Sequence, residues 1–208
     1  MIRRLLWAAL VAVAAAGAPV LAQAPAGWRV HTDPSQNAQD PDNTPNLTFA
    51  AMGKGFHVVS GPAGTFWHPS NMANGSYVLR GTFNLMEPSN HTNYYGLVFG
   101  GRDLEGPNQS YTYFVVAQDG TFQVRQRMGR QVTTVQAPTM NAAVRRPAAN
   151  GQSSNTLEVR VAGDTISYVV NGTVVHSGPK GSTATDGLTG VRVNHVLNVH
   201  VEGFAVGK

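Results

Sequence analysis

Asp103 and Glu105 form the only close pair of carboxylates that one face of a single strand could carry. Glycoside hydrolysis requires two carboxyl groups, about 5 to 5.5 Å apart for retention of configuration or about 6.5 to 9.5 Å apart for inversion. Pro107 and Asn108 follow the pair and favour a solvated loop after a strand. We therefore interpret these carboxylates as loop residues first, with contact to a sugar or a cation, or catalysis, as the alternatives.

Aromatic rings beside polar side chains could bind a sugar, because a pyranose has an apolar CH face and a rim of hydroxyl groups. Trp67 is the strongest aromatic candidate, because the run WHPS at 67–70 is expected to close a strand into a polar loop and leave the ring partly exposed. Burial in a core is the alternative for every ring. The other candidates for contact with a ligand are Tyr94, Tyr111, Tyr113, Arg102, Asp103, Asn108 and Gln109.

A polar row follows these aromatic residues in the sequence. Arg125, Arg127 and Arg130 alternate along one expected strand and its turn, and Gln123 shares their face. Paired hydrogen bonds from such a row could bind an anionic glycan. An ordinary solvated sheet face is the alternative interpretation.

The sequence predicts neither a metal site nor a cofactor. The seven histidines are dispersed, and the five-residue spacing of His195 and His200 would place them on opposite faces of one strand. There is no cysteine to form a disulfide, a thiolate nucleophile or a Cys-based metal site. The chain also has no Gly-x-Ser-x-Gly elbow, phosphate loop or dinucleotide fingerprint.

Short alternating runs between turn residues must position these side chains, and they predict an all-β chain without a long helix. Asp119-Gly120 and Asn171-Gly172 each predict a β-hairpin, because these dipeptides favour two-residue turns that need positive φ at both positions. Because the turn alone explains Asn171, its replacement by Asp or Gly is expected to leave stability nearly unchanged. The expected strands are 47–52, 56–60, 65–68, 76–86, 94–101, 111–118, 121–128, 155–161, 165–170, 173–176, 190–196 and 197–206.

The alternation also assigns faces to these strands. Leu157, Val159 and Val161 point opposite to Glu158 and Arg160, so this strand is half buried and needs a second sheet to cover its apolar face. The runs 95–100 and 111–116 are apolar on both faces, which is typical of central strands whose second face could line a groove. The prediction is a two-sheet antiparallel β-sandwich.

Three segments resemble one superfamily. Residues 155–172 read NTLEVRVAGDTISYVVNG and are followed by TVV, while 94–100 read YYGLVFG and 111–116 read YTYFVV. These hairpin and central-strand patterns resemble concanavalin A-like lectin and glucanase domains, including laminin-G-like and 3-keto-disaccharide hydrolase domains. The resemblance implies a jelly roll that binds a glycan or polysaccharide. Hydrolysis is the alternative, although the Glu-x-Asp-x-x-Glu strand of the β-glucan hydrolases is absent here.

The N-terminus has the layout of a secretory signal. Arg3 and Arg4 precede an apolar run at 5–16 and a small-residue exit, which predicts cleavage after Ala22 and a secreted or periplasmic protein. No later segment is apolar enough to span a membrane. Residues 23–46 are predicted to be irregular and pinned by Trp28, and residues 47–208 to form one domain. Loss of the two arginines reduces the net charge from +4 to +2, which argues against nucleic-acid binding; the oligomeric state stays open.

Overall fold

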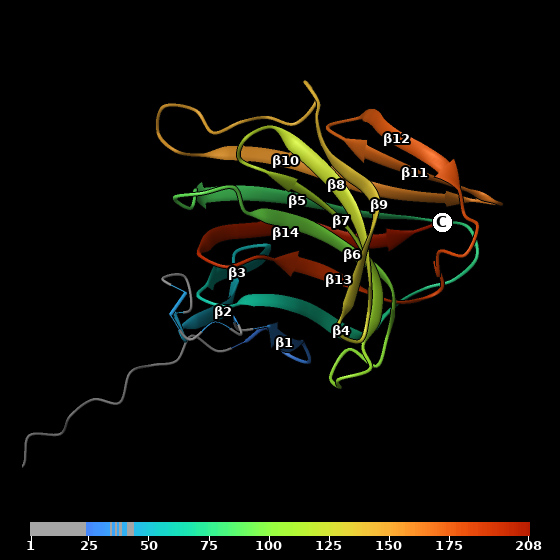
Figure 1. Ribbon diagram of the computed structural model, residues 1–208, viewed down its shortest axis with the longest axis horizontal. Helices are drawn as coiled ribbons and strands as arrows, with labels where there is room; N and C mark the ends of the chain where they lie inside the picture. The colour runs from blue at the N-terminus through green and yellow to red at the C-terminus, as the bar shows by residue number, and fades with distance from the viewer. Residues whose placement is uncertain (1–23, 34, 36, 38, 41–43) are drawn as a thin grey trace, which may run out of the picture.

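The computed structural model describes residues 24–33, 35, 37, 39–40 and 44–208, and its regular elements there are all β-strands (Figure 1). The predicted signal peptide, residues 1–22, lies outside the described residues. Within them, no helix is long and apolar enough to cross a membrane.

Two antiparallel sheets of seven strands each form a sandwich. Strands adjacent in space are often distant in sequence, so the chain crosses repeatedly between the sheets, as a jelly roll requires. In spatial order, sheet A contains β1 (Arg29–Asp33), β4 (Ala63–Ala73), β13 (Gly187–Val193), β6 (Tyr94–Arg102), β7 (Ser110–Ala117), β8 (Thr121–Met128) and β9 (Gln131–Met140). Sheet B contains β12 (Thr173–Pro179), β11 (Thr165–Val170), β10 (Ser153–Ala162), β5 (Tyr77–Glu87), β14 (Leu197–Gly207), β3 (Gly55–Ser60) and β2 (Leu47–Met52). The predicted fold class is confirmed.

The core lies between the sheets, and period-two alternation positions it. On β5, Leu79, Phe83 and Leu85 are fully buried while Arg80 is exposed. On β10, the predicted apolar face is buried in the same cluster. Strands β6 and β7 are buried on both faces, as their continuous apolar runs predicted.

Strand β1 lies inside the segment that was predicted to be irregular. It pairs with β4 along five residues, from Arg29 opposite Trp67 to Asp33 opposite Ala63. Its sequence, RVHTD, has a single large apolar residue, so hydrophobic alternation could not reveal it. The expectation for Trp28 is confirmed, because its ring packs against Phe49, Phe56 and Phe204.

Two further strands differ from the sequence prediction. Edge strand β9 is largely exposed and contains Pro138, so its polar sequence showed no buried face. Strand β4 continues through Pro69 instead of ending in a polar loop near Trp67. The proline is tolerated because β1 pairs with β4 only as far as Trp67, so no β1 carbonyl faces the missing N–H.

The two predicted hairpin turns differ in backbone conformation. Asn171 and Gly172 both have positive φ, 50° and 83°, as predicted. At the other hairpin only Gly120 has positive φ. Asp119 instead accepts hydrogen bonds from the backbone N–H and the hydroxyl of Thr121, at 2.9 and 2.6 Å, which stabilises a longer connection.

The side chain of Asn171 does more than permit a turn. Its amide donates to the carbonyl of Ala143 and to Asn155 Oδ1, both at 2.8 Å, and its oxygen accepts from the N–H of Thr156 at 2.9 Å. The turn therefore ties β10 to the segment after β9. These hydrogen bonds lead us to revise the expectation that Asn171 can be replaced without cost.

We expect Gly172→Val and Asn171→Asp each to lower the free energy of unfolding by about 1 to 3 kcal/mol, the first through backbone strain and the second through lost amide donors. A Cβ at Gly172 would meet no atom within 4 Å, so its cost reports strain alone. Urea and thermal melts measure both effects, and Thr173→Val on the adjacent strand is the control. An Asn171→Asp protein as stable as the wild type would refute the bridging role.

Candidate functional site

The face of sheet A that turns away from sheet B carries most of the predicted ligand-contacting side chains. On β7, Phe114 and Val116 point into the main core, whereas Tyr111, Tyr113 and Val115 point away from it. The strand register extends this outer face across the sheet, because paired residues of antiparallel strands share a face. Its members are Arg29, His31, Asp33, Thr65, Trp67, Arg192, Val98, Tyr111, Tyr113, Val115, Gln123, Arg125 and Arg127.

Sheet A curls strongly around the outer face. Arg127 on β8 donates to Asp33 on β1 at 2.7 Å, although β4, β13, β6 and β7 lie between these strands. In a flat sheet the two strands would be about 24 Å apart, farther than the side chains can reach. The outer face is therefore the concave side of a bent sheet, and the bend of β7 and β8 is visible in Figure 1.

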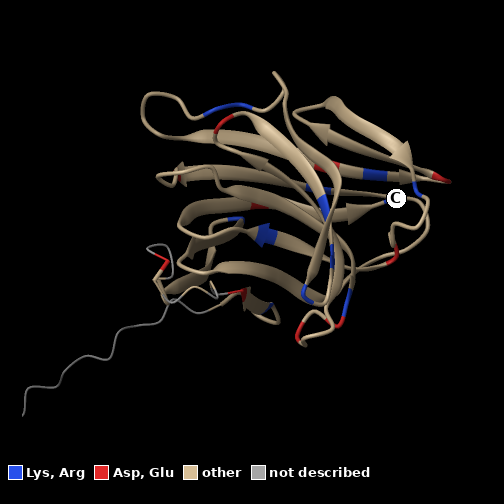
Figure 2. Cartoon of the chain, viewed as in Figure 1, with Lys and Arg blue, Asp and Glu red and all other residues tan. Residues whose placement is uncertain are grey.

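A buried ion cluster closes the centre of this concave face. The carboxylate of Asp33 accepts from Arg127 and from Arg192, at 2.7 and 2.6 Å. Arg192 also donates to Thr65 Oγ1 and to the hydroxyl of Tyr111, both at 3.0 Å. Figure 2 shows the basic positions on β8 and β13 that contribute the two arginines. The cluster thus joins five strands of sheet A, which are β1, β4, β13, β7 and β8.

Burial and charge oppose each other in this cluster. Burial alone would raise the pKa of Asp33, but Arg192 and Arg127 outweigh it and hold that pKa below its ordinary value. Burial acts to lower the pKa of Arg192, and the surrounding Tyr111 and Asp33 reverse this effect and raise it. The pKa of the Tyr113 hydroxyl is raised because the ring is desolvated, although the Arg192 guanidinium lies 5.8 Å from the ring centroid.

Polar groups beside the cluster are incompletely paired. Gln109 is 1% exposed and its amide nitrogen lies 2.8 Å from His31 Nε2, while its buried Oε1 has no hydrogen-bond partner among the described residues. Arg125 lies opposite Tyr113, and within the same part of the chain its buried Nε has no hydrogen-bond partner either. The face thus carries the guanidiniums of Arg127 and Arg192 on the carboxylate of Asp33, and that of Arg125 opposite Tyr113.

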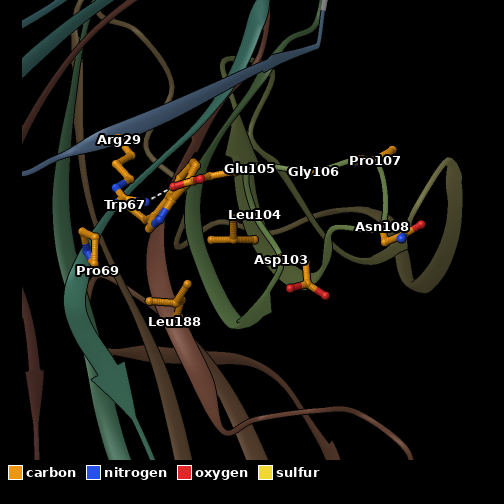
Figure 3. A pocket seen from close by; sticks show the side chains of 10 residues that line it. All are labelled: Arg29, Trp67, Pro69, Asp103, Leu104, Glu105, Gly106, Pro107, Asn108 and Leu188. Atoms are coloured by element: carbon orange, nitrogen blue, oxygen red, sulfur yellow. Dashed lines mark hydrogen bonds and ion pairs between the residues drawn. The ribbon is translucent and has the colours of Figure 1, made fainter.

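A pocket of about 570 Å³ opens at the edge of the outer face, under the loop that joins β6 to β7 (Figure 3). Its floor is apolar and comes from the edge of Trp67 and from Leu104 and Leu188, and polar groups form the rim. Glu105 reaches over Trp67 to form an ion pair with Arg29. The lining residues are Arg29, Trp67, Pro69, Asp103, Leu104, Glu105, Gly106, Pro107, Asn108 and Leu188.

The structure brings together most of the residues that the sequence singled out. Trp67, Asp103, Glu105 and Asn108 line the pocket. Tyr111, Tyr113, Gln123, Arg125 and Arg127 lie on the outer face, and Gln109 contacts it through His31. Arg102 lines a different hollow with Met128 and Ser182.

Two expectations about exposure are wrong. Trp67 is 2% exposed, because β4 continues past it and the loop around Leu104 covers its ring. Arg125 and Arg127 are half-buried in the curl, so the interpretation of their strand as an ordinary solvated face is wrong.

Asp103 and Glu105 lie in the loop after β6, not along a strand face, and Asp103 has a φ of 50°. The interpretation of both carboxylates as loop residues is confirmed.

Comparison with other proteins identifies the fold but no sequence family. No protein-family model matches the chain, and no curated protein sequence matches it. The carbohydrate-binding module CBM66 from Bacillus subtilis matches with a TM-score of 0.63 at 12% identity, over 88% of this chain and 96% of that one. A Bacillus subtilis protein of unknown function with a galectin-like fold matches with a TM-score of 0.61 at 13% identity, over 86% and 88%.

A third match is the Bacteroides ovatus mixed linkage glucan PUL GH16 in complex with a product, with a TM-score of 0.55 at 7% identity, over 84% of this chain and 92% of that one. The chain shares its β-sandwich fold with these three proteins. At these identities the likeness establishes the fold alone, and the function of the site depends on this chain's own residues.

Sequence reasoning missed the central ion cluster of this sandwich. Arg192 could have been found, because it is the one charge between Val191 and Val193 in an apolar run. Asp33 gave no such signal, since it lies among Pro, Asn and Gln residues and its partner is 159 positions away. No group of three or more His, Cys, Asp or Glu side chains able to hold a metal occurs among the residues that the structure describes.

We expect Asp33→Ala to lower the free energy of unfolding by about 3 kcal/mol, because it leaves the buried guanidinium of Arg192 and the half-buried guanidinium of Arg127 without their carboxylate. Glu105→Gln breaks the exposed pair with Arg29 and should cost less than about 1 kcal/mol. Urea denaturation at neutral pH measures both changes. Equal losses in the two variants would show that the cluster does not hold the curl.

The pH dependence of the free energy of unfolding distinguishes stabilisation by the ion cluster from stabilisation by packing. Because the pKa of Asp33 is lowered from 3.8 by folding, its stabilisation is complete above that ordinary value and is lost as the pH falls through the lowered pKa. The stability advantage of the wild type over Asp33→Ala should therefore shrink in that range. An advantage that does not change with pH would assign the effect to packing.

Proposed function

We propose that the chain is an exported, non-catalytic glycan-binding domain whose ligand occupies the pocket between Trp67 and the β6–β7 loop. The observation that carries this proposal is the composition of that pocket, an apolar floor within a polar rim. A pyranose has the matching form, with apolar CH groups on its faces and hydroxyl groups around its edge. A volume of about 570 Å³ lies in the range of small-molecule sites.

The rim residues provide donors and acceptors in the number that a sugar requires. The guanidinium of Arg29 can donate to two neighbouring hydroxyl groups, and the carboxylates of Glu105 and Asp103 can accept from others. Without a ligand, Arg29 and Glu105 pair with each other on the exposed rim, where a ligand can exchange with either partner. The side chain of Trp67 is packed beneath them, so it contributes an apolar edge to the floor and not an open face for stacking.

The matched folds support a binding function, because one of those proteins is a carbohydrate-binding module and another has a galectin-like fold. The predicted signal peptide over residues 1–22 and the small net charge of the remaining chain support export to the periplasm or the cell exterior. Polysaccharides of a cell envelope or of plant material are the ligand class that such a domain would encounter.

We expect calorimetry to detect binding of a neutral or acidic polysaccharide. Glu105→Gln and Asn108→Ala should each weaken this binding by roughly tenfold, because each removes a well-placed hydrogen bond worth about 1.4 kcal/mol. Asp164→Asn, in the exposed β10–β11 turn, is the matched control. Absence of binding to any glycan at millimolar concentration, with a cooperative melt proving the fold, would eliminate the proposal.

A hydrolase is the second candidate, because Asp103 and Glu105 line the same pocket. Glycoside hydrolysis requires two carboxyl groups that flank one bond. Here the Glu105 carboxylate is directed at Arg29 and the Asp103 carboxylate points elsewhere (Figure 3). We therefore expect no release of sugar from glucans or 3-keto-glycosides. Release that disappears in both Asp103→Asn and Glu105→Gln would establish the hydrolase instead.

A further inference from the structure

Two histidines from distant parts of the chain face each other at the opposite end of sheet A from the pocket. His91 lies in the connection between β5 and β6, and His195 lies in the turn between β13 and β14. Their Nε2 atoms are 3.0 Å apart and their ring centroids 5.2 Å apart. His91 precedes β6 and Asp103 follows it, so the nine-residue strand separates the pair from the pocket by up to about 30 Å.

The loop that carries His91 is held rigidly. Gln118 accepts from the N–H of Ser89 at 3.1 Å and donates to the carbonyls of Ser89 and His91, at 2.8 and 3.1 Å. Inside the loop, the Ser89 hydroxyl donates to the His91 carbonyl, and buried Asn93 donates to Ser89 Oγ at 3.0 Å. The backbone carbonyl of His91 thus accepts two hydrogen bonds, from Gln118 and from Ser89, and Ser89 is itself held by Gln118 and Asn93.

The turn that carries His195 is equally constrained. Buried Ser60 donates to the carbonyl of Asn194 and accepts from the N–H of Leu197 at 3.0 Å, so one hydroxyl clamps both ends of the turn. Val196 has a φ of 53°, which is strained for a β-branched residue. Such strain persists only where the surroundings enforce it, and it clusters at functional positions.

We propose that His91 and His195 chelate one divalent transition-metal ion through their Nε2 atoms. Two nitrogens bound to one ion at about 2.0 to 2.1 Å lie about 2.9 Å apart at a right angle and about 3.4 Å apart at the tetrahedral angle. The observed 3.0 Å lies within this interval. The two Nε2 atoms are therefore spaced for one ion, which would also displace the contact of 3.1 Å between His91 Nε2 and the amide nitrogen of Asn93.

Imidazole nitrogens select copper, nickel and zinc ions, with copper bound most tightly. In the metal-free pair one Nε2 carries a proton that the other accepts. When an ion binds both Nε2 atoms, that proton moves to Nδ1 of the same ring, and binding is weaker in acid because protons compete with the ion for the ring nitrogens. Water completes the coordination of this two-ligand site. Asp40 lines the same small pocket as His195 and adds negative charge nearby, which favours a cation.

The site would fasten two connections that both pass between the sheets. The His91 loop leads from β5 in sheet B to β6 in sheet A, and the His195 turn leads from β13 in sheet A to β14 in sheet B. An ion bound only by the folded chain stabilises it by mass action. The proposal does not depend on glycan binding, because the two sites share no residue.

Calorimetric titration of the full exported chain, without a polyhistidine tag, with ZnCl₂ and NiCl₂ tests the proposal. We expect one ion per chain, a rise in the melting temperature, and at least roughly tenfold weaker binding in His91→Gln and in His195→Gln, since even outer-shell changes cost that much. His57→Gln is the matched control, because His57 and His200 form another pair, with ring centroids 6.0 Å apart.

Electron paramagnetic resonance of the Cu²⁺-loaded chain provides a readout that a structural role would not change. Two imidazole nitrogens should split the copper signal in the wild type, and one should remain in each variant. Melts of the metal-free variants verify that they fold. Binding that is equally strong in both variants, or that is lost equally in His57→Gln, would overturn the proposal.

Discussion

The carboxylate of Asp33 holds sheet A in its curled shape. It is the acceptor shared by Arg192 and Arg127, which come from strands at different distances around the curl. A carboxylate paired with one guanidinium would only neutralise a charge. Because Asp33 also pairs with Arg127, it sets the distance between β1 and β8. Replacing a buried ion cluster with apolar residues often stabilises a protein, so we assign this cluster a geometric role. The cluster specifies how far sheet A bends.

The curl explains why sheet A has two apolar faces. Its inner face packs on sheet B, and its concave outer face encloses a second, smaller cluster that includes Trp67, Val98, Tyr111 and Val115. A flat sheet would leave these side chains in water. The same bend carries the β6–β7 loop over the edge of the sheet, where Leu104 inserts into the small cluster. The pocket beside Leu104 is thus a consequence of the bend that Asp33 maintains.

Much of this architecture could be predicted from local sequence. Alternation assigned the core faces of β5 and β10, and continuous apolar runs identified β6 and β7 as central strands. Local patterns could not reveal β1, because an edge strand with one large apolar residue has no periodicity to detect. They also predicted a partly exposed Trp67, because its burial depends on a loop 37 residues later in the chain. Contacts between distant segments decide which residues the bend covers.

The two proposed sites occupy opposite ends of β6 and β13, and the chain builds them differently. At the pocket end, exposed rim residues such as Arg29 and Glu105 retain freedom to exchange partners with a ligand. At the other end, Ser60 and Gln118 fix the backbone of both histidine-bearing segments, and Val196 is kept in a strained conformation. A sugar with several hydroxyl groups tolerates an adjustable rim, whereas an ion that requires two nitrogens about 3 Å apart does not. The contrast in rigidity therefore matches the two ligand classes.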